Sequence, residues 1–299
     1  MAWRSVLISQ PARLSLKNRQ LLLEQEAGQS VSLPLEDIAV IVLETPQATI
    51  TSALLAELAA QDVAVITCDA THHPNGVLLP FLPHSRTFKV MKQQLALTLP
   101  QKKRAWQSVV QQKLRNQAAC LEHFAPGRGL FLREQAERVG SGDPENREGT
   151  AARYYFVELF GPAFTREQEI WHNAALNYGY AILRAAIARS LVCHGFLPAF
   201  GLHHHSQLNA FNLADDFIEP LRPVVDAWVR SHPLASGALG SADKTALLQT
   251  LYTDVQMPSG TMNVLAAIDQ MAHAFGRFCA KGDYTQLAWP QLAPAQLSN

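Results

Sequence analysis

Cysteine and charge are both scarce in this sequence of 299 residues. Its four cysteines include no Cys-x-x-Cys pair, which argues against a thiolate zinc site and a dithiol redox motif. Charged residues make up 17% of the chain, below the roughly 25% typical of globular domains, and hydrophobic residues make up 48%. This composition is the reverse of that of a disordered chain, so we expect a large folded core.

The sequence also has no long uncharged apolar run. Its most apolar stretch, residues 181–192, is interrupted by Arg184 and Arg189, whereas a membrane span needs about 20 nearly uncharged residues. The apolar run after Arg4 is too short for a secretory signal. We therefore expect a cytoplasmic protein without a membrane partner, whose cysteines are small buried residues in a reducing compartment.

Acidic residues are absent from residues 70–121, although the formal net charge of the chain is zero. Basic side chains without neighbouring carboxylates can contact nucleic-acid phosphates without repulsion. A solvated face on a pair of long helices explains the same pattern, and this feature alone does not decide between the two. The basic residues of the stretch are Arg86, Lys89, Lys92, Lys102, Lys103, Arg104, Lys113 and Arg115.

The hydrophobic pattern changes character near residues 80–90. Before this point short runs predict strands, and residues 38–43 form an almost continuous β-branched run, typical of a strand covered on both faces. One short helix is expected at residues 52–61. The dipeptide Asn75-Gly76 predicts a turn. After this point the patterns are helical to about residue 280.

We therefore predict an α+β protein with more than one domain. A small N-terminal β-rich domain would span residues 1–85, and a larger all-α catalytic domain would span residues 86–290, followed by a tail at residues 291–299. The helical patterns of the second domain cover residues 86–98, 101–124, 145–160 and 169–194, with a short run at residues 133–139.

One helix start carries a carboxylate of interest. Asp143 suits an N-cap and Pro144 suits the first helical position, which places Glu148 near the helix N-terminus. Gly149 costs about 1 kcal/mol relative to alanine in such a helix, which suggests that something bulky approaches beside the carboxylate. Routine decoration of a helix N-terminus is the alternative. Arg153 is expected to serve a neighbouring surface.

A histidine triplet and an acidic helix form two further candidate segments. The histidines at residues 203–205 cannot all bind one ion from a regular helix, because adjacent residues diverge by about 100°. One of them acting as a ligand is more reasonable, and incidental histidines in a polar loop are the alternative. Asp216 and Glu219 share a helical face, and Arg222 can pair with Glu219 and fix its side chain. A solvated acidic face would explain these residues too.

Two carboxylates and one histidine on separate helices would suit Mn²⁺ or Mg²⁺ better than zinc. His204 and Glu219 would lie roughly 22 Å apart on one continuous helix. A shared metal therefore requires a turn between them, which we expect at residues 207–212.

Several segments resemble the CRISPR-associated integrase/endonuclease family, the universal spacer-acquisition subunit, in the version encoded beside the single-protein effector nuclease of type II systems. The resemblance covers nearly the whole chain, including the β-then-α order. Residues 146–156 are similar to the first metal-ligand helix of that family, and residues 173–183 to its long central helix. The remaining similar runs are residues 201–204, 209–216 and 218–226.

The resemblance implies that Glu148, His204 and Glu219 are the metal ligands and catalytic residues. Asp216 matches a further acidic position, and Arg222 would support Glu219. Other subtypes often have aspartate at the third ligand position. His204 fits the family spacing best, with the neighbouring histidines, residues 203 and 205, as alternatives.

The resemblance also implies an activity in antiviral defence. The 3′-hydroxyl of a short duplex attacks a phosphodiester at the edge of the CRISPR repeat, with Mg²⁺ or Mn²⁺ as cofactor, and family members also cut branched and single-stranded DNA. A generic metal-dependent DNA nuclease without integration and a non-catalytic DNA-binding scaffold are the alternatives. DNA would be bound by Arg86, Lys89, Lys102, Lys103, Arg104, Lys113, Arg115 and Arg153.

The partners implied by the resemblance are double-stranded DNA, as spacer precursor and repeat, a second copy of the chain, and a small ferredoxin-like CRISPR adaptation protein. The type II effector nuclease is a further candidate. The homodimer would form through the β-rich domain. Residues 38–43 would fit a sheet buried at that interface, and an intramolecular core explains them equally well.

Overall fold

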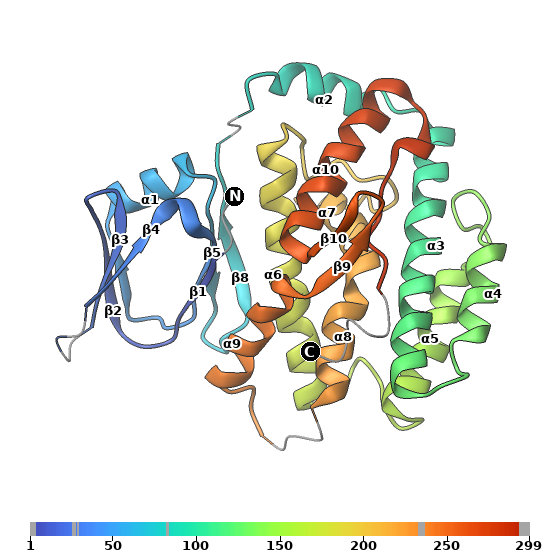
Figure 1. The fold of residues 1–299 in the computed structure, drawn as a ribbon, viewed down its shortest axis with the longest axis horizontal. Helices are drawn as coiled ribbons and strands as arrows, with labels where there is room; N and C mark the ends of the chain where they lie inside the picture. The colour runs from blue at the N-terminus through green and yellow to red at the C-terminus, as the bar shows by residue number, and fades with distance from the viewer. Residues whose placement is uncertain (1–3, 26–27, 29, 82–83, 233–236, 293–299) are drawn as a thin grey trace.

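The computed structural model describes residues 4–25, 28, 30–81, 84–232 and 237–292. Figure 1 shows a part built mainly from strands beside a larger helical part. This is the mixed α+β class in the expected chain order. The predicted boundary between two domains near residue 85 stays a prediction. One hydrophobic core includes residues from both parts, among them Val40 and Tyr178, so packing alone does not divide the chain there.

Two four-stranded sheets form the N-terminal part. In the first, ordered β1-β5-β7-β8, the first three strands run parallel and β8 runs antiparallel to β7. In the second, ordered β4-β3-β2-β6, three antiparallel strands are extended by β6 parallel to β2. The strands are β1 (Arg4–Ile8), β2 (Ala12–Lys17), β3 (Gln20–Gln25), β4 (Ser30–Pro34), β5 (Ile38–Leu43), β6 (Ala48–Ile50), β7 (Ala64–Cys68) and β8 (Pro74–Leu78).

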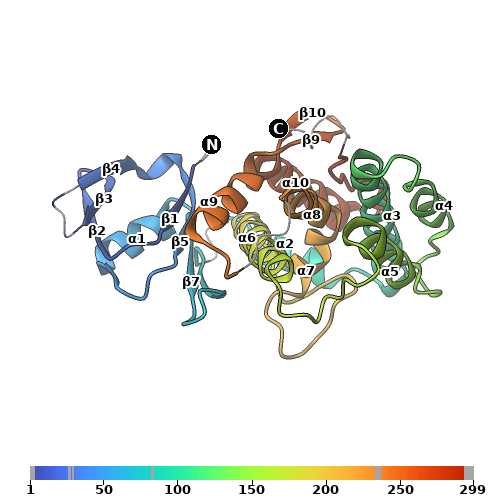
Figure 2. The ribbon, with the colours of Figure 1, turned by 90° about the horizontal axis from the view of Figure 1, so that it is seen from below.

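The strand β5 lies between β1 and β7 and is buried on both faces, as the sequence predicts. On one face Ile41 packs with Leu54 and Leu58 of helix α1 (Ser52–Ala60), which lies between the two sheets in Figure 2. On the other face Val40 and Val42 join the core of the helical part. The intramolecular core therefore accounts for this apolar run without a second copy of the chain.

The turn predicted at Asn75-Gly76 is wrong, because both residues lie inside β8. The chain reverses earlier, where the Asp69 carboxylate accepts hydrogen bonds from the amides of Thr71 and His73 at 2.8 and 3.0 Å. A short side chain that bonds nearby backbone amides makes a turn of its own, and this overrides the dipeptide signal.

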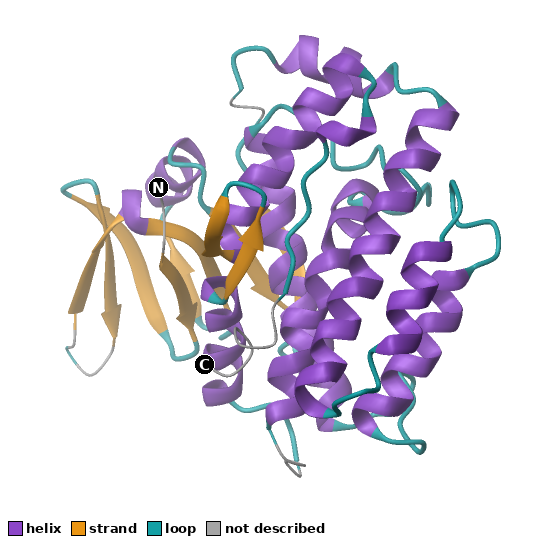
Figure 3. Ribbon diagram, turned by 45° about the vertical axis from the view of Figure 1, so that its right-hand side comes forward, coloured by secondary structure: helices purple, strands orange, loops and turns teal. Residues whose placement is uncertain are grey.

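Long and short helices make up most of the rest, and a β-hairpin interrupts them (Figure 3). The helices are α2 (Thr87–Leu95), α3 (Leu99–Phe124), α4 (Leu130–Arg138), α5 (Arg147–Phe160), α6 (Trp171–Cys193), α7 (Asn212–Ile218), α8 (Arg222–Ser231), α9 (Ser241–Gln249) and α10 (Val264–Lys281). Short 3-10 turns are η1 (Leu35–Asp37), η2 (Glu219–Leu221), η3 (Thr250–Tyr252) and η4 (Tyr284–Gln286).

The hairpin of β9 (Asp254–Met257) and β10 (Gly260–Asn263) corrects the expectation of an all-α second part. Each strand has only 4 residues, too few for a period-two pattern to stand out in the sequence. The start of the expected tail is held here too, since Gln291 bridges to Gln256 and Leu292 is buried. Residues 293–299 of that tail lie outside the described residues.

All four cysteines are free, and each is buried or half-buried. Within the described ranges, no helix combines the length and apolar content that crossing a bilayer requires.

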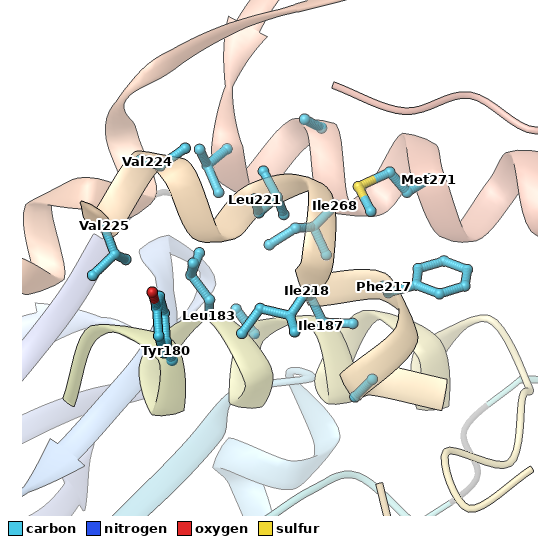
Figure 4. Packing of buried hydrophobic residues seen from close by; sticks show 14 of the residues in the cluster. Tyr180, Leu183, Ile187, Phe217, Ile218, Leu221, Val224, Val225, Ile268 and Met271 are labelled. Carbon is cyan, nitrogen blue, oxygen red and sulfur yellow. The ribbon is translucent and has the colours of Figure 1, made fainter. Parts of the chain in front are cut away.

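The packing around α6 positions the functional segment. Tyr180 and Leu183 of α6, Ile218 and Leu221 around η2, and Ile268 of α10 meet in one buried cluster (Figure 4). This cluster holds the run from α7 through η2 to α8 between two long helices. Glu219, the first residue of η2, is therefore carried on a segment held by core packing.

Candidate active site

The helix α5, which carries Glu148, begins at Arg147, three residues after the first helical position predicted at Pro144. Its N-cap is Asn146, which has a left-handed backbone (φ 49°) and accepts a hydrogen bond from the Gly149 amide at 3.3 Å. Asp143 lies upstream and accepts hydrogen bonds from the amides of Arg147 and Glu148 at 2.9 and 3.0 Å. Two side chains thus satisfy the free amides of the first turn and hold Glu148 at the start of the helix.

The cap also explains Gly149. A Cβ atom at this position would lie 2.8 Å from the side chain of Asn146. The glycine therefore makes room for the capping asparagine, and the interpretation that it admits a bulky group beside Glu148 is not needed.

Glu219 is buried where α7 passes into η2, with 4% of its surface exposed. The apolar residues Leu213, Phe217 and Leu221 bury the face of this run that packs on the core. Arg222 Nε donates a hydrogen bond to Glu219 Oε1 at 2.8 Å, which is the pairing that the sequence predicts.

Lys113 of α3 joins the two glutamates. Its Nζ atom lies 2.5 Å from Glu148 Oε1 and 2.5 Å from Glu219 Oε2. The Lys113 side chain is only 7% exposed, against 27% for Glu148 and 5% for Glu219. The structure thus corrects the placement of Lys113, which lies inside the site and not on an exposed surface with the other basic residues.

The opposite charges in this cluster stabilise the ionised forms of Glu219 and Lys113. Burial by itself would raise the pKa of Glu219, but the charges of Arg222 and Lys113 lower it to about 2. Burial would lower the pKa of Lys113, but the charges of Glu219 and Glu148 raise it above its ordinary value. Glu219 and Lys113 are therefore both ionised at neutral pH.

The histidine triplet adjoins this cluster in a loop that Asp216 organises. Asp216 is fully buried and accepts hydrogen bonds from the backbone amides of Leu202, His203 and His204. It also lies 2.8 Å from Nδ1 of His204, and this hydrogen bond raises the pKa of His204. With Nδ1 engaged by a carboxylate, Nε2 is the nitrogen of His204 that can face a ligand.

The other two histidines have different surroundings. The ring of His203 stacks on Trp106 with centroids 4.2 Å apart, and burial lowers its pKa. His205 is exposed, and its Nδ1 lies 2.8 Å from the His203 carbonyl oxygen. A Cβ atom on Gly201 would lie 2.7 Å from Asp216 Oδ2, so the close approach of the loop to Asp216 requires glycine here.

The expected turn at residues 207–212 is present. Asn212 begins α7, and its side chain bonds both the amide and the carbonyl of Ser206 at 3.2 and 2.9 Å. The turn brings the histidine loop back alongside α7.

The side chains of this cluster include the ligand types that a hard divalent cation prefers. Among the residues that the structure describes, no three or more His, Cys, Asp and Glu side chains are arranged to hold a metal ion. Glu148 and Glu219 nevertheless direct carboxylate oxygens at one positive charge. Glu219 Oε2 is buried, and in the described chain it receives an ion pair but no hydrogen bond. Two carboxylates that converge on one point suit Mg²⁺ or Mn²⁺ as ligands.

Most of the remaining basic residues line the outside. Arg86, Lys89, Lys103, Arg104, Arg115 and Arg153 are exposed and Lys102 is half-buried. Arg115 is paired with Glu137 at 2.9 Å, so its charge is partly neutralised. A hollow lies between α2 and α10. Among the described residues that line it there is no carboxylate, and the basic ones are His84, Arg86, Lys89, His194, His273 and Arg277.

The helical period of α3 predicts that Lys113 is buried. On α3 it lies four residues after Val109 and four before Gln117, and all three side chains are on the buried face of the helix. Asn116 and Gln117 are buried polar residues of this helix too, and the sequence alone did not indicate the role of Asn116.

Comparisons with known proteins agree with this fold. The family model described as CRISPR associated protein Cas1 matches residues 6–233. The CRISPR-associated endonuclease Cas1 of Neisseria meningitidis serogroup C (strain 8013) is 44% identical over 301 residues, which cover 98% of this chain and 98% of the relative.

Two solved structures are similar in fold. A casposase bound to integration product has a TM-score of 0.77 and 18% identity, over 95% of this chain and 92% of that chain. A Cas6-RT-Cas1–Cas2 complex has a TM-score of 0.75 and 17% identity, over 97% of this chain and 36% of that chain. The family match and the relative at 44% identity define the class as CRISPR-associated proteins. This chain belongs to the Cas1 family, as the sequence resemblance predicts.

Proposed function

We propose that this protein is the integrase of CRISPR adaptation, which inserts short DNA duplexes at the CRISPR repeat and also cuts DNA. The observation that carries the proposal is the convergence of Glu148 and Glu219 on one positive charge, 2.5 Å from each carboxylate. Membership of a family that includes a CRISPR-associated endonuclease at 44% identity gives this site its context.

The proposed reaction exchanges one phosphodiester for another. The 3′-oxygen of the incoming duplex forms a bond to a phosphorus of the repeat, and the bond from that phosphorus to its own 3′-oxygen breaks. The attacking hydroxyl loses a proton and the departing oxygen gains one. Mg²⁺ or Mn²⁺ would stabilise the charge that develops on the phosphate oxygens.

The residues of the chain have distinct tasks in this proposal. Glu148 and Glu219 would hold the ion, and His204 would be the neutral third ligand. Asp216 sets the tautomer and orientation of His204, and Arg222 engages one oxygen of Glu219 while the other faces Lys113.

DNA would lie across the exposed basic residues. Contacts to phosphates position a duplex without reading its sequence, as a protein that accepts any spacer requires. The residues proposed for this role are Arg86, Lys89, Lys102, Lys103, Arg104, Arg115 and Arg153.

The proposed partners are a second copy of this chain, a small ferredoxin-like CRISPR adaptation protein, and the type II effector nuclease. A Cas6-RT-Cas1–Cas2 complex contains a chain of similar fold, which supports an adaptation partner of that kind. The reaction would take place in the cytoplasm.

Incubation with a short duplex and a repeat-containing plasmid tests the proposal. The wild-type protein should join the two DNAs in Mn²⁺, and Glu148→Gln should lose joining and cutting by at least 100-fold while binding duplex normally. Glu145→Gln is the matched control, because Glu145 precedes the same helix with its side chain 66% exposed. Joining by Glu148→Gln at the wild-type rate would contradict the site.

The same assay separates the two alternatives. Nicks without joined products would indicate a nuclease without integrase activity. Binding without either product, in wild type and variant alike, would indicate a scaffold.

A further inference from the structure

The ammonium group of Lys113 has the surroundings of a bound cation. It lies at the same distance, 2.5 Å, from oxygens of two glutamates on different helical segments. One ammonium thus faces two carboxylates, and Arg222, 2.8 Å from the other oxygen of Glu219, supplies the second positive charge that balances them.

The two distances to Lys113 set an upper limit on the spacing of the carboxylate oxygens. Glu148 Oε1 and Glu219 Oε2 can be no farther apart than twice their distance to Lys113 Nζ. Two oxygens on opposite sides of one Mg²⁺ are separated by about 4 Å. An ion bound between the two glutamates would therefore need the space that the ammonium takes, with small movement of the carboxylates.

We propose that Lys113 is an internal counter-ion, which holds Glu148 and Glu219 together in the metal-free protein and withdraws when a divalent ion binds. The inference rests on the proposed metal site. It adds that Lys113 competes with the ion, so that this lysine lowers the affinity for metal while it preserves the arrangement of the ligands. Lys113 is thus a positioning residue for the site.

The chain contains a matched pair for comparison. Lys244 Nζ lies 2.6 Å from Glu44 Oε1, and these side chains are 6% and 7% exposed. Lys244 is therefore buried as deeply as Lys113 and paired as closely, but with a carboxylate that is not part of the proposed site. Any general effect of metal on buried lysines should appear at both positions.

Amine labelling of the wild-type protein tests the withdrawal. Acetylation by an N-hydroxysuccinimide ester is followed at each lysine by peptide mass spectrometry, in EDTA and in Mn²⁺. Lys113 should be protected in EDTA and at least fivefold more reactive in Mn²⁺, while Lys244 stays protected in both. Equal protection of Lys113 in the two conditions would overturn the proposal.

Metal affinity tests the competition. Lys113→Met should bind Mn²⁺ at least tenfold more tightly than wild type, measured from the electron paramagnetic resonance signal of free Mn²⁺, and Lys244→Met should bind as wild type does. Lys113→Met should also have a lower melting temperature in EDTA, which Mn²⁺ restores. Unchanged or weaker binding by Lys113→Met would overturn the proposal.

The outcomes separate this inference from the proposed function. Mn²⁺ binding by wild type that Glu148→Gln abolishes, with no effect of Lys113→Met, would leave the metal site standing and overturn the role of Lys113. A wild-type protein that binds no Mn²⁺ would overturn both. Should Lys113→Met not fold in either condition, the labelling of the wild-type protein decides.

Discussion

The side chain of Asn116 donates a hydrogen bond of 2.7 Å to the main-chain oxygen of Pro220, the residue that follows Glu219. The same amide group donates to the Pro290 oxygen at 2.8 Å, and its oxygen accepts from the Leu292 amide at 3.1 Å. One fully buried side chain on α3 thus connects η2 and the C-terminal segment to the helix that carries Lys113. This connection fixes the position of η2 along α3, and so places the Glu219 carboxylate beside the Lys113 ammonium group.

Replacement of Asn116 should therefore be costly. Asn116→Leu leaves three main-chain groups without their buried partner and should lower the free energy of unfolding by about 3 kcal/mol, measured by urea denaturation. Ser32→Ala is the control, because the hydrogen bond from Ser32 to Gln20 is exposed and its loss should change stability by less than about 0.5 kcal/mol. A loss below about 1 kcal/mol for Asn116→Leu would show that the connection is unimportant.

Asp226 should give the protein a distinctive pH dependence. Its carboxylate is fully buried on α8 and accepts hydrogen bonds from the hydroxyl groups of Tyr155, at 3.0 Å, and Tyr180. Burial raises the pKa of Asp226 from 3.8 to about 6, although the two tyrosine hydrogen bonds and the charges of Arg222 and Arg166 act in the opposite direction.

The raised pKa of Asp226 determines whether the protein becomes more or less stable as the pH rises. Between about pH 4 and pH 6 the folded protein keeps a proton that the unfolded chain has lost, so the contribution to stability falls as the pH rises through this range. The free energy of unfolding should fall by about 3 kcal/mol in total across this range because of Asp226. Asp226→Asn cannot titrate, so the difference in unfolding free energy between wild type and variant should change by this amount across the range. Urea denaturation at a series of pH values measures it, and a constant difference would contradict the assignment.

The elements with long, regular patterns were predictable. The strand at residues 38–43 and the long helices around residues 101–124 and 169–194 appear within a few residues of their expected bounds. Each repeats its apolar period often enough to be recognised. The hairpin of β9 and β10 repeats its pattern too few times, and its existence depends on packing against α10 and the bridge to Gln291.

The types of residue in the site were predictable from the sequence, but their positions relative to one another were predictable only in part. Family resemblance directed attention to Glu148 and Glu219, and the structure brings their carboxylates together. Asp216 was expected on the face that carries Glu219, whereas its carboxylate bonds the histidine loop. Lys113 was grouped with exposed basic residues, since charge counting takes no account of the helical face. Pairing across α3, α5 and η2 is a tertiary property that no local pattern contains.

Asp216 should affect both stability and metal binding. Asp216→Asn replaces one acceptor oxygen with an amide NH2 group, a donor that would face the backbone N–H groups of the histidine loop. The variant should lower the free energy of unfolding by about 2 kcal/mol. Because Asp216 also orients His204, the variant should bind Mn²⁺ about tenfold more weakly. Thermal unfolding and a Mn²⁺ titration measure the two effects.

The neighbouring Asp215 gives the control for this experiment. Its carboxylate pairs with Arg184 at 2.6 Å and accepts no hydrogen bond from the histidine loop in the described chain. Asp215→Asn should therefore keep the wild-type affinity for Mn²⁺. Equal weakening by the two variants would mean that the charge of this segment matters, and not the hydrogen bond to His204.

The proposed DNA surface predicts a change in salt dependence. Each phosphate contact that releases a counterion contributes about 0.9 to the slope of log K against log salt concentration. The triple replacement of Lys102, Lys103 and Arg104 by alanine should reduce the slope for duplex DNA by about 2.7 if all three contact phosphates. Fluorescence anisotropy at several salt concentrations measures the slope.

A matched triple variant on the N-terminal sheet tests whether the effect is local. Arg13, Lys17 and Arg19 lie on or beside β2 and β3 and are exposed, so their replacement by alanine removes the same total charge from a different face. This variant should keep the wild-type slope, because contacts at the phosphates and not net charge determine counterion release. Equal slopes for both variants and the wild-type protein would show that DNA does not lie along the start of α3.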